Sequence, residues 1–346
     1  MSLLISVVVP MFRGGKCIRE ALASIVNQSY RNFEIVIVDN NASEETRGIA
    51  YEFLEKYPNI IRIVLEKEQG SPFAKNTGIR ESRGEFIAFL EDDDVMLENR
   101  LEKQLQKIQE VPHASLVYCL VNHISFDGRE ILKKDHVNKP EFWAELLFKD
   151  DPSYRENPLV NPFPSSIFFR KSLSTKIGGF DTKFSPVVLD DTDFNLRMYE
   201  QGPFARVNEA LTNYRVSSRE LFLLKRKGIT DWIRIRSNLS YFYSKLAIRY
   251  FDPKDSRKVE AFKKIQSQWI REFAKELFAY RDGVKPGRYM LERSIKANPY
   301  DIKNWLYMLR SYYPEKLFLK SFHLERLEEE KIMEKIDYHF LESLYR

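Results

Sequence analysis

The sequence has little cysteine, little histidine and no long hydrophobic run, and each shortage removes a class of protein. Its 346 residues include two cysteines, Cys17 and Cys119, without Cys-x-x-Cys spacing, so neither a disulfide framework nor a zinc site is expected. The five histidines form no pair at helical spacing, which leaves zinc hydrolase chemistry without support. No stretch approaches the roughly 18 consecutive apolar residues of a membrane-spanning helix, and the first residues lack the charged head of a signal peptide. A cytoplasmic protein is therefore expected.

A glycine-rich phosphate loop is also missing. The turn after the first predicted strand, residues 10–15, contains neither Gly-x-Gly-x-x-Gly nor the Gly-Lys-Ser/Thr of a P-loop. Those loops identify dinucleotide-binding and P-loop proteins. A nucleotide bound by this chain is expected to have its phosphates held through a metal ion instead.

Charge is present in quantity but unevenly distributed. Apolar residues make up 43% and charged residues 30%, which is typical of a folded globular protein, and the length fits two domains. Residues 220–346 carry 27 Lys and Arg against 18 Asp and Glu, a balance of +9, which leaves −4 for residues 1–219. A basic surface of this kind indicates either an anionic partner, such as a membrane, or the ordinary solvated face of a helical domain.

Strand-like and helix-like segments alternate through the first part of the chain. Interior strands are predicted at 5–9, 33–38, 61–65 and 85–90, from runs of β-branched and other apolar residues. Apolar residues at helical spacing fill the intervals, and Asn41 with Glu44 is predicted to form a capping box. The alternation predicts an α/β fold with a mostly parallel sheet sandwiched by helices.

The second part of the chain is mixed and then helical. A helix is predicted at 97–108, followed by an antiparallel hairpin of 115–126 with 131–132. Residues 150–164 contain four prolines and are predicted to form a long functional loop. Only helical patterns remain after residue 215, the clearest at 232–246, 265–278 and 324–336. We therefore predict two domains, 1–219 and an all-helical domain at 220–346.

Two acidic clusters are the strongest chemical signal. Residues 91–94 read Glu-Asp-Asp-Asp directly after a buried strand, and residues 190–193 read Asp-Asp-Thr-Asp. Adjacent carboxylates repel one another and resist desolvation, so a cation is expected near 91–94. Oxygen ligands favour a hard ion, Mg²⁺ or Mn²⁺. Helix capping is the alternative at both clusters, but a position beyond the carboxyl end of a strand favours a ligand site.

A series of short motifs follows in a fixed order between residues 3 and 216. They lie at 7–12, 24–30, 33–39, 74–79, 84–94, 178–181, 190–194 and 214–215. Together they resemble the family 2 nucleotide-sugar glycosyltransferases, which have the Rossmann-like GT-A fold. The resemblance implies an inverting, metal-dependent enzyme that moves a sugar from a nucleoside diphosphate, with UDP as the first expectation. The acceptor would be a hydroxyl of a glycan or glycolipid, as in cell-surface polysaccharide synthesis.

The resemblance also implies a nucleotide-binding set. Asp39 corresponds to the residue that binds the nucleotide base, beside the backbone of Pro10 and Met11, and Arg13 belongs to the same loop. Lys75 stands where the family usually has an arginine that contacts the base or the diphosphate. Lysine keeps the positive charge but lacks the planar two-pronged donor.

The two acidic clusters take catalytic and donor-binding roles in the resemblance. Glu91 and Asp92 correspond to donor contacts, Glu91 toward the ribose, and Asp93 corresponds to the metal ligand. Asp92 with Asp94 offers the same spacing, so the register by one residue stays open. Asp191 corresponds to the catalytic base, which takes the proton of the attacking hydroxyl.

Some positions depart from the family pattern. Asp190 replaces the usual glutamate, and Ser217 stands where many members have a histidine. The second cluster is predicted to open a helix that contains Phe194, Met198 and Tyr199. Structural roles therefore also fit it, in which Asp190 and Asp193 would cap this helix or hold Arg197.

Other functions are open at this point. One is a sugar-nucleotide-binding protein without catalysis, and another is a nucleotidyltransferase of similar sheet topology. The basic helical domain is expected to pack on the catalytic domain, to form a dimer contact, or to bind the inner face of the cell membrane peripherally. No nucleic-acid-binding module accompanies the charge.

Overall fold

The structure, a computed structural model, describes residues 3–12, 14–125, 128, 130–132, 142–148, 150–156, 158–185, 189–215, 241–243, 245–277 and 284–311. The chain divides into two compact units. The first comprises Met1–Glu141 and Asp151–Lys225, and the second Phe142–Asp150 and Arg226–Arg346. The second unit thus takes in a short segment from the middle of the chain.

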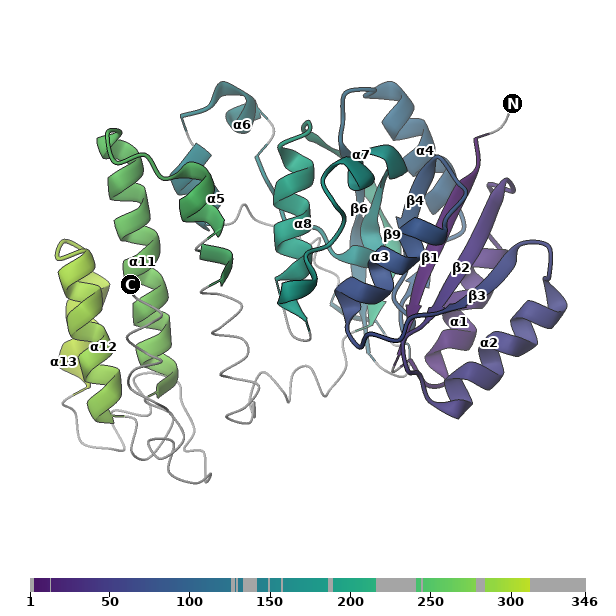
Figure 1. Ribbon diagram of the computed structural model, residues 1–346, viewed down its shortest axis with the longest axis horizontal. Coiled ribbons are helices and arrows are strands. Elements are labelled where there is room, and N and C mark those ends of the chain that lie inside the picture. The colour runs from purple at the N-terminus through teal and green to yellow at the C-terminus, as the bar shows by residue number, and fades with distance from the viewer. Residues whose placement is uncertain are drawn as a thin grey trace. The chain divides into compact units, whose positions relative to one another are not determined.

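The first unit is built on one mixed sheet of nine strands (Figure 1). The strands are β1 (Ile5–Met11), β2 (Phe33–Asp39), β3 (Ile61–Leu65), β4 (Phe86–Phe89), β5 (Val95–Met96), β6 (Leu116–Ile124), β7 (Glu130–Leu132), β8 (Ile167–Arg170) and β9 (Phe204–Arg215). Their order is β3-β2-β1-β4-β8-β6-β9-β5, and β7 pairs with β6. Strands β1 to β4 are parallel, β8 is antiparallel to both its neighbours, and β6 and β9 are parallel to each other. The predicted α/β fold is confirmed, as is the antiparallel hairpin of β6 and β7.

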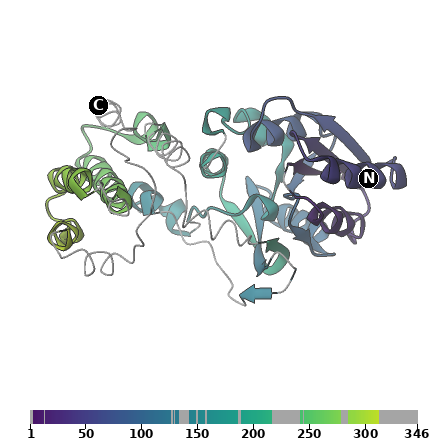
Figure 2. The ribbon, with the colours of Figure 1, turned by 90° about the horizontal axis from the view of Figure 1, so that it is seen from below.

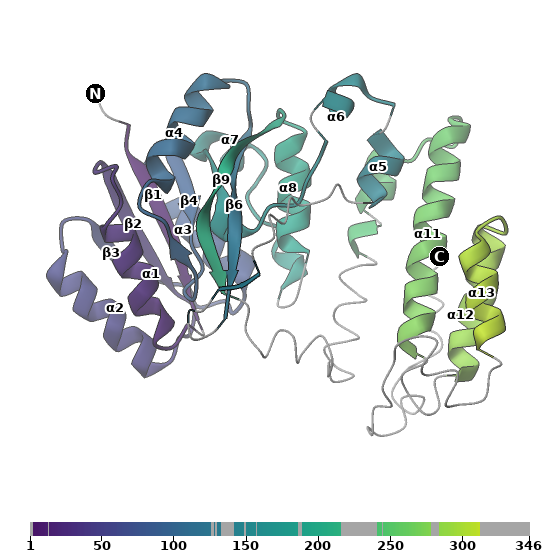
Figure 3. The same ribbon diagram turned by 180° about the vertical axis from the view of Figure 1, so that it is seen from behind.

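Helices cover both faces of this sheet. They are α1 (Cys17–Val26), α2 (Glu44–Lys56), α3 (Ser71–Glu81), α4 (Arg100–Glu110), α7 (Lys171–Lys176) and α8 (Asp190–Tyr199), with short 3₁₀ turns at η1 (Pro164–Ser166) and η2 (Thr182–Phe184). Helix α6 (Pro152–Glu156) stands away from the sheet (Figure 1), and its Tyr154 ring contacts that of Tyr199 of α8. Helices α3, α7 and α8 cover the face of the sheet that is turned toward the viewer in Figure 1. Helices α1 and α4 cover the opposite face, which Figure 3 shows from the other side.

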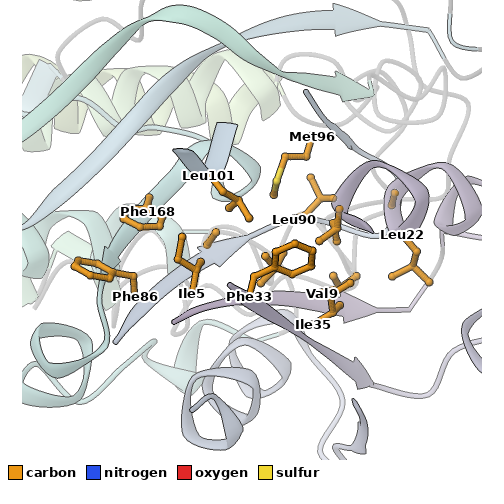
Figure 4. Close-up of a cluster of buried hydrophobic side chains, with 14 of the residues drawn as sticks. Ile5, Val9, Leu22, Phe33, Ile35, Phe86, Leu90, Met96, Leu101 and Phe168 are labelled. Carbon is orange, nitrogen blue, oxygen red and sulfur yellow. The ribbon is translucent and has the colours of Figure 1, made fainter. Parts of the chain in front are cut away.

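The core follows from the two-residue period of the strands. Val7 and Val9 point to the face that α1, α2 and α4 cover, where Leu22 and Leu101 join them (Figure 4). Val8 points to the other face, against α3. A Cβ at Gly78 of α3 would lie 2.1 Å from the Val8 side chain, so glycine is required for this close approach.

Three local predictions need correction. Ser43, not Asn41, caps α2, because the Ser43 hydroxyl accepts the Thr46 N–H at 3.2 Å, whereas Asn41 adopts a positive φ of 66°. Helix α4 begins at Arg100 rather than at 97, since β5 occupies residues 95–96. The acidic run at 91–94 therefore does not cap α4. The stretch predicted as a loop at 150–164 contains the short helix α6.

The second unit is helical in the part that the structure describes. Its helices are α5 (Phe142–Phe148), α11 (Ser256–Leu277), α12 (Val284–Ala297) and α13 (Ile302–Arg310). Helices α11, α12 and α13 lie side by side in the views of Figures 1 and 2. The helix predicted at 265–278 is confirmed within α11, whereas those at 232–246 and 324–336 fall largely or wholly outside the described residues. Within the described ranges, no helix has the length and apolar character needed to cross a bilayer.

Candidate active site

The candidate site lies at the edge of the sheet where the parallel strands end. Strands β1, β2 and β4 run in the same direction, so Met11, Asp39 and the residues after Phe89 come to one edge. Strand β8 is antiparallel, and its start brings Ser165 to the same edge, where the Ser165 hydroxyl accepts the Glu91 N–H at 2.9 Å. Ligands of open α/β sheets collect at this edge.

Asp39 is held at the end of β2. It lies opposite Met11 in the β1–β2 register, with Pro10 one residue before, so these predicted nucleotide contacts are neighbours. The Asp39 carboxylate accepts the Ala42 N–H at 3.0 Å and pairs with the Arg47 guanidinium at 2.6 Å. Arg47 was not predicted, because its pairing depends on how α2 turns back over the strand end.

The acidic run alternates between two kinds of environment. Asp92 accepts the N–H groups of Phe12 and Gly14 at 2.7 and 2.8 Å, and Asp94 accepts the N–H of Arg215 at 2.7 Å. A Cβ at Gly14 would lie 2.5 Å from the Asp92 carbonyl oxygen, so the β1–α1 loop needs glycine there. The carboxylates of Asp92 and Asp94 therefore bind backbone of the protein itself.

The alternate residues of the run have a different setting. Glu91 and Asp93 are both half-buried, whereas Asp92 and Asp94 are buried. The Glu91 carboxylate lies 3.7 Å from the Lys75 ammonium. The Asp93 carbonyl accepts Arg215 Nε at 2.7 Å, which fixes the backbone at that residue.

Lys75 gathers three carboxylates from separate parts of the chain. Its Nζ lies 2.5 Å from Asp191 Oδ1, 3.3 Å from Asp190 Oδ2 and 3.7 Å from Glu91 Oε1. The Lys75 side chain is 2% exposed, and its Nζ also lies 5.0 Å from the centre of the Phe180 ring. We refer to Lys75, Glu91, Asp190 and Asp191 as the Lys75 cluster. It joins α3, the end of β4 and the start of α8.

Burial, together with the neighbouring charges, shifts the pKa values of these groups. Burial raises the pKa of Asp191 to about 6, with Asp190 adding to the rise and Lys75 opposing it. Burial likewise raises the pKa of Glu91 to about 8 against the opposing Lys75. Burial alone lowers the pKa of Lys75, but the three carboxylates outweigh it and hold that pKa above its ordinary value. The lysine is therefore charged.

The start of α8 is fixed by contacts behind the site. Asn76 bonds the backbone of Phe180 in both directions, at 2.8 and 2.7 Å, and the Phe180 ring stacks on Phe194 of α8 at 4.0 Å. Asp193 pairs with Arg197 at 2.6 Å, so the structural role considered for Asp193 is confirmed. Immediately before the helix, Leu189 has a φ of 79°, in the left-handed region that disfavours residues with a Cβ.

The acidic residues of the site can supply a divalent cation with only part of its ligands. Among the described residues, no group of three or more His, Cys, Asp or Glu side chains is placed to hold a metal ion. A Mg²⁺ or Mn²⁺ ion in a nucleotide site takes one or two protein carboxylates and completes its shell with phosphate and water oxygens. The half-buried Asp93 at the strand end fits that smaller requirement.

The structure thus brings the predicted residues that it describes to one edge of the sheet, where strand pairing, hydrogen bonds and ion pairs connect them. Asp39 lies beside Met11, Phe12 binds Asp92, and Glu91 and Asp191 share Lys75. Arg13 and Ser217 lie outside the described residues. Ser165 and Arg47 were not anticipated, and only the proline-rich context of Ser165 gave any signal in the sequence.

Known proteins resemble this chain in sequence. The pattern of the family described as Glycosyl transferase family 2 matches residues 6–178, half of the chain. A GalNAc(5)-diNAcBac-PP-undecaprenol beta-1,3-glucosyltransferase of Campylobacter jejuni is 31% identical over 173 residues, 49% of this chain and 52% of the relative. An uncharacterized glycosyltransferase of Methanocaldococcus jannaschii is 30% identical over 229 residues, 64% of this chain and 74% of the relative. Several curated relatives, the Campylobacter protein among them, are matched over only about half their length.

Solved structures share the fold. TarS of S. aureus, residues 1–349 in complex with UDP-GlcNAc, aligns with a TM-score of 0.57 at 17% identity, covering 90% of this chain and 91% of that one. The mannosyltransferase PcManGT from Pyrobaculum calidifontis, in complex with GDP-Man and Mn²⁺, aligns with a TM-score of 0.53 at 18% identity, covering 92% and 84%. At these identities the likeness shows the GT-A fold alone. On the family pattern across half of its residues, and a relative matched over 74% of its own length, the chain belongs to glycosyl transferase family 2.

Proposed function

We propose that this protein transfers a sugar from a nucleoside diphosphate sugar to a hydroxyl of a glycan or glycolipid, with inversion at the anomeric carbon. UDP is the nucleotide that we propose first. One observation carries the proposal. Glu91 and Asp191, 100 residues apart in sequence, meet around the buried ammonium of Lys75 at the sheet edge where Asp39 also lies.

The donor side of the proposal uses the ends of β1, β2 and β4. Asp39 accepts the base N–H, with Met11 and Pro10 beside it, and Arg47 keeps that carboxylate in place at 2.6 Å. Glu91 is the residue proposed to reach the ribose. The alternation in the acidic run supports this register, since Asp92 and Asp94 already bind backbone N–H groups.

Asp93 is the residue proposed to hold a divalent cation together with the donor diphosphate. The cation, when bound, stabilises the negative charge that develops on the departing diphosphate. The protein's own part is to fix the carboxylate: the bond from Arg215 Nε to the Asp93 carbonyl holds the backbone from which it projects.

Asp191 is proposed as the general base. The acceptor oxygen forms a bond to the anomeric carbon while the bond from that carbon to the phosphate oxygen breaks, and its electron pair leaves with the diphosphate. The hydroxyl proton passes to the Asp191 carboxylate. Two features support this role: the Asp191 side chain is 33% exposed, so an acceptor can reach it, and its pKa of about 6 is near the value at which a carboxylate is an effective base at neutral pH.

The relatives support the donor and acceptor classes. TarS has been solved with UDP-GlcNAc and PcManGT with GDP-Man, so a nucleotide sugar is the donor class to test. The name of the Campylobacter relative describes a lipid-diphosphate-linked glycan as its acceptor, which makes such a glycolipid the first acceptor to test here.

The exchange Asp191→Asn tests the proposal. It removes the proton-accepting charge with little change of shape, so transfer is expected to fall by roughly 100-fold to 10,000-fold. Binding of UDP with Mn²⁺, measured by calorimetry, is expected to remain. A panel of UDP- and GDP-sugars supplies the donors, and hydrolysis of the donor without acceptor gives a second readout. Normal turnover in the variant would refute the assignment of the base. No turnover of any donor by the unchanged protein would favour the binding-protein alternative.

The helical unit is proposed to attach the enzyme to an anionic membrane. Residues 220–346 carry the +9 balance, and α13 with the residues before it exposes large apolar side chains: Tyr300 at 95%, Ile302 at 70% and Leu309 at 63%. Flotation with vesicles containing phosphatidylserine is expected to carry the protein at low salt. Flotation equal to that with neutral vesicles would overturn this part.

A further inference from the structure

Lys75 has a setting that differs from that of a donor-binding residue. Its side chain is 2% exposed, and its ammonium is surrounded by Asp190, Asp191, Glu91 and the ring of Phe180. An ammonium so enclosed has its charge already directed at protein groups. Contact with a diphosphate would require those carboxylates to give up their cation.

The geometry toward Asp191 is specific. Lys75 Nζ donates to Asp191 Oδ1 at 2.5 Å, while the contact with Asp190 is 3.3 Å and that with Glu91 is 3.7 Å. Among the described residues, none donates a hydrogen bond to the second oxygen of Asp191, Oδ2, and a third of the side chain is exposed. One oxygen is therefore held by the lysine, and the other is left for a further hydrogen bond.

Lys75 is itself rigidly placed. Its neighbour Asn76 binds Phe180 through both atoms of the amide, and Gly78 lets α3 lie directly on Val8 of the sheet. The lysine is thus mounted on a helix that cannot shift without breaking contacts on two sides. A charge on such a support fixes the position of whatever it binds.

We infer that Lys75 is a positioning residue for the general base: it holds Asp191 by one oxygen, keeps it ionised beside Asp190 and Glu91, and leaves the other oxygen for the acceptor proton. The inference rests on the proposed function. It gives Lys75 a role in the acceptor half of the reaction, whereas the family resemblance implies a contact with the donor.

The charges around Asp191 decide the direction of the expected effect. Asp190 lies beside it on α8, Lys75 faces it from α3, and Glu91 faces the same lysine from the end of β4. Lys75 is the one cation among these four groups. Its loss leaves only carboxylates around Asp191, so the proton affinity of Asp191 must rise.

Lys75→Met removes the charge and keeps much of the side-chain length. In the pH dependence of kcat, the acidic limb is expected to move to higher pH by about one unit or more. The value of kcat at neutral pH is expected to fall by roughly 10-fold or more. The Kd of UDP with Mn²⁺ is expected to stay within about 2-fold. Lys75→Arg, which restores the charge, is expected to return the limb toward its original position. The exposed lysine variant Lys56→Met serves as the control and should match the unchanged protein.

The opposite pattern would overturn the inference. A loss of UDP affinity of 10-fold or more, about 1.4 kcal/mol, with an unmoved acidic limb would show that Lys75 contacts the donor. A fall in Tm with no movement of the limb would show a merely structural role.

A measurement without turnover separates this inference from the proposed function. Carboxyl NMR titration of the protein labelled at aspartate, with the Asp191 signal assigned by its loss in Asp191→Asn, reports the pKa of Asp191 directly. A higher pKa in Lys75→Met supports the ion pair as the controlling contact even if no donor is turned over. An unchanged pKa overturns it even in an active enzyme. If Lys75→Met does not fold, Lys75→Arg and Lys75→Gln are compared in the same titration.

Discussion

Each unit of the molecule contains a buried polar cluster, and the two clusters differ in their balance of charge. In the helical unit, Arg271 pairs with Asp301 and with the Asn304 amide, and Asn304 in turn binds Ser267 and Ser294. That set has one cation, one anion and neutral groups whose donors and acceptors meet. The Lys75 cluster has one cation against three carboxylates.

The difference separates a structural cluster from a functional one. A charge-balanced network links α11, α12 and α13 and accounts for its own place in the structure by packing. A cluster in which acidic groups outnumber the cation lowers stability, and such clusters occur where a substrate, a proton or a cation completes the balance. The comparison therefore predicts that changes in one cluster act on stability and changes in the other on activity.

The largest difference between two variants is expected at Asp93 and Asp94, which are adjacent residues of the acidic run at 91–94. Asp93→Ala is expected to lower kcat/KM by roughly 100-fold or more, because it removes a carboxylate from the place where charge develops. Asp94→Ala removes the acceptor of the Arg215 N–H and is expected to lower the free energy of unfolding by about 1–3 kcal/mol. Donor turnover and thermal unfolding of both variants measure this contrast. Equal behaviour of the two would break the alternation on which the register depends.

In the helical unit the expected effect is on stability alone. Asn304→Ala leaves Ser267, Ser294 and Arg271 without their shared partner and is expected to cost roughly 2–3 kcal/mol of unfolding free energy. Urea unfolding of this variant, beside the exposed control Lys303→Ala, provides the measurement. Transfer to a water-soluble acceptor should persist at temperatures where the variant is folded. A catalytic defect there would contradict the separation of the two clusters.

The pH dependence of stability sharpens the comparison further. The pKa of Asp191, about 6, lies above its ordinary value of 3.8, so the folded state binds this proton more tightly than the unfolded state does. The stability that this proton provides is present below about pH 4 and is lost as the pH rises through about 6. Tm measured across that range should fall less steeply in Asp191→Asn than in the unchanged protein. Parallel curves would show that Asp191 has no raised pKa.

The fold and the location of the candidate site could be predicted from the sequence, because they depend on strand periodicity and on the order of the motifs. Asp39 and the run at 91–94 follow recognisable strands, and parallel strands bring their carboxyl ends to one edge whatever the side chains between them. The start of α8 at Asp190 was likewise predicted from its acidic first turn.

The pairings inside the site were not accessible in the same way. Lys75 and Asp191 are 116 residues apart, and their contact depends on how α3 and α8 pack through Phe180. No local pattern reports such a distance. The sequence also placed the cap of α2 two residues early, because Asn41 and Ser43 are both good caps and only the backbone angle of 66° at Asn41 decides between them.

The smallest effect is expected at Leu189, where the backbone before the Lys75 cluster is strained. Its φ of 79° costs a residue with a Cβ about 1 kcal/mol, and such strain is retained next to functional residues when the surrounding structure holds it. Leu189→Gly and Leu189→Ala both remove the side chain, but only glycine relieves the angle, so the glycine variant is expected to be more stable than the alanine variant by about 1 kcal/mol. The free energies of unfolding of the two variants are compared by urea unfolding. Because both variants lack most of the leucine side chain, the loss of its apolar contacts largely cancels in the difference. If alanine equals glycine, the left-handed turn is absent in solution, and the position of Asp190 and Asp191 at the start of α8 would need a different support.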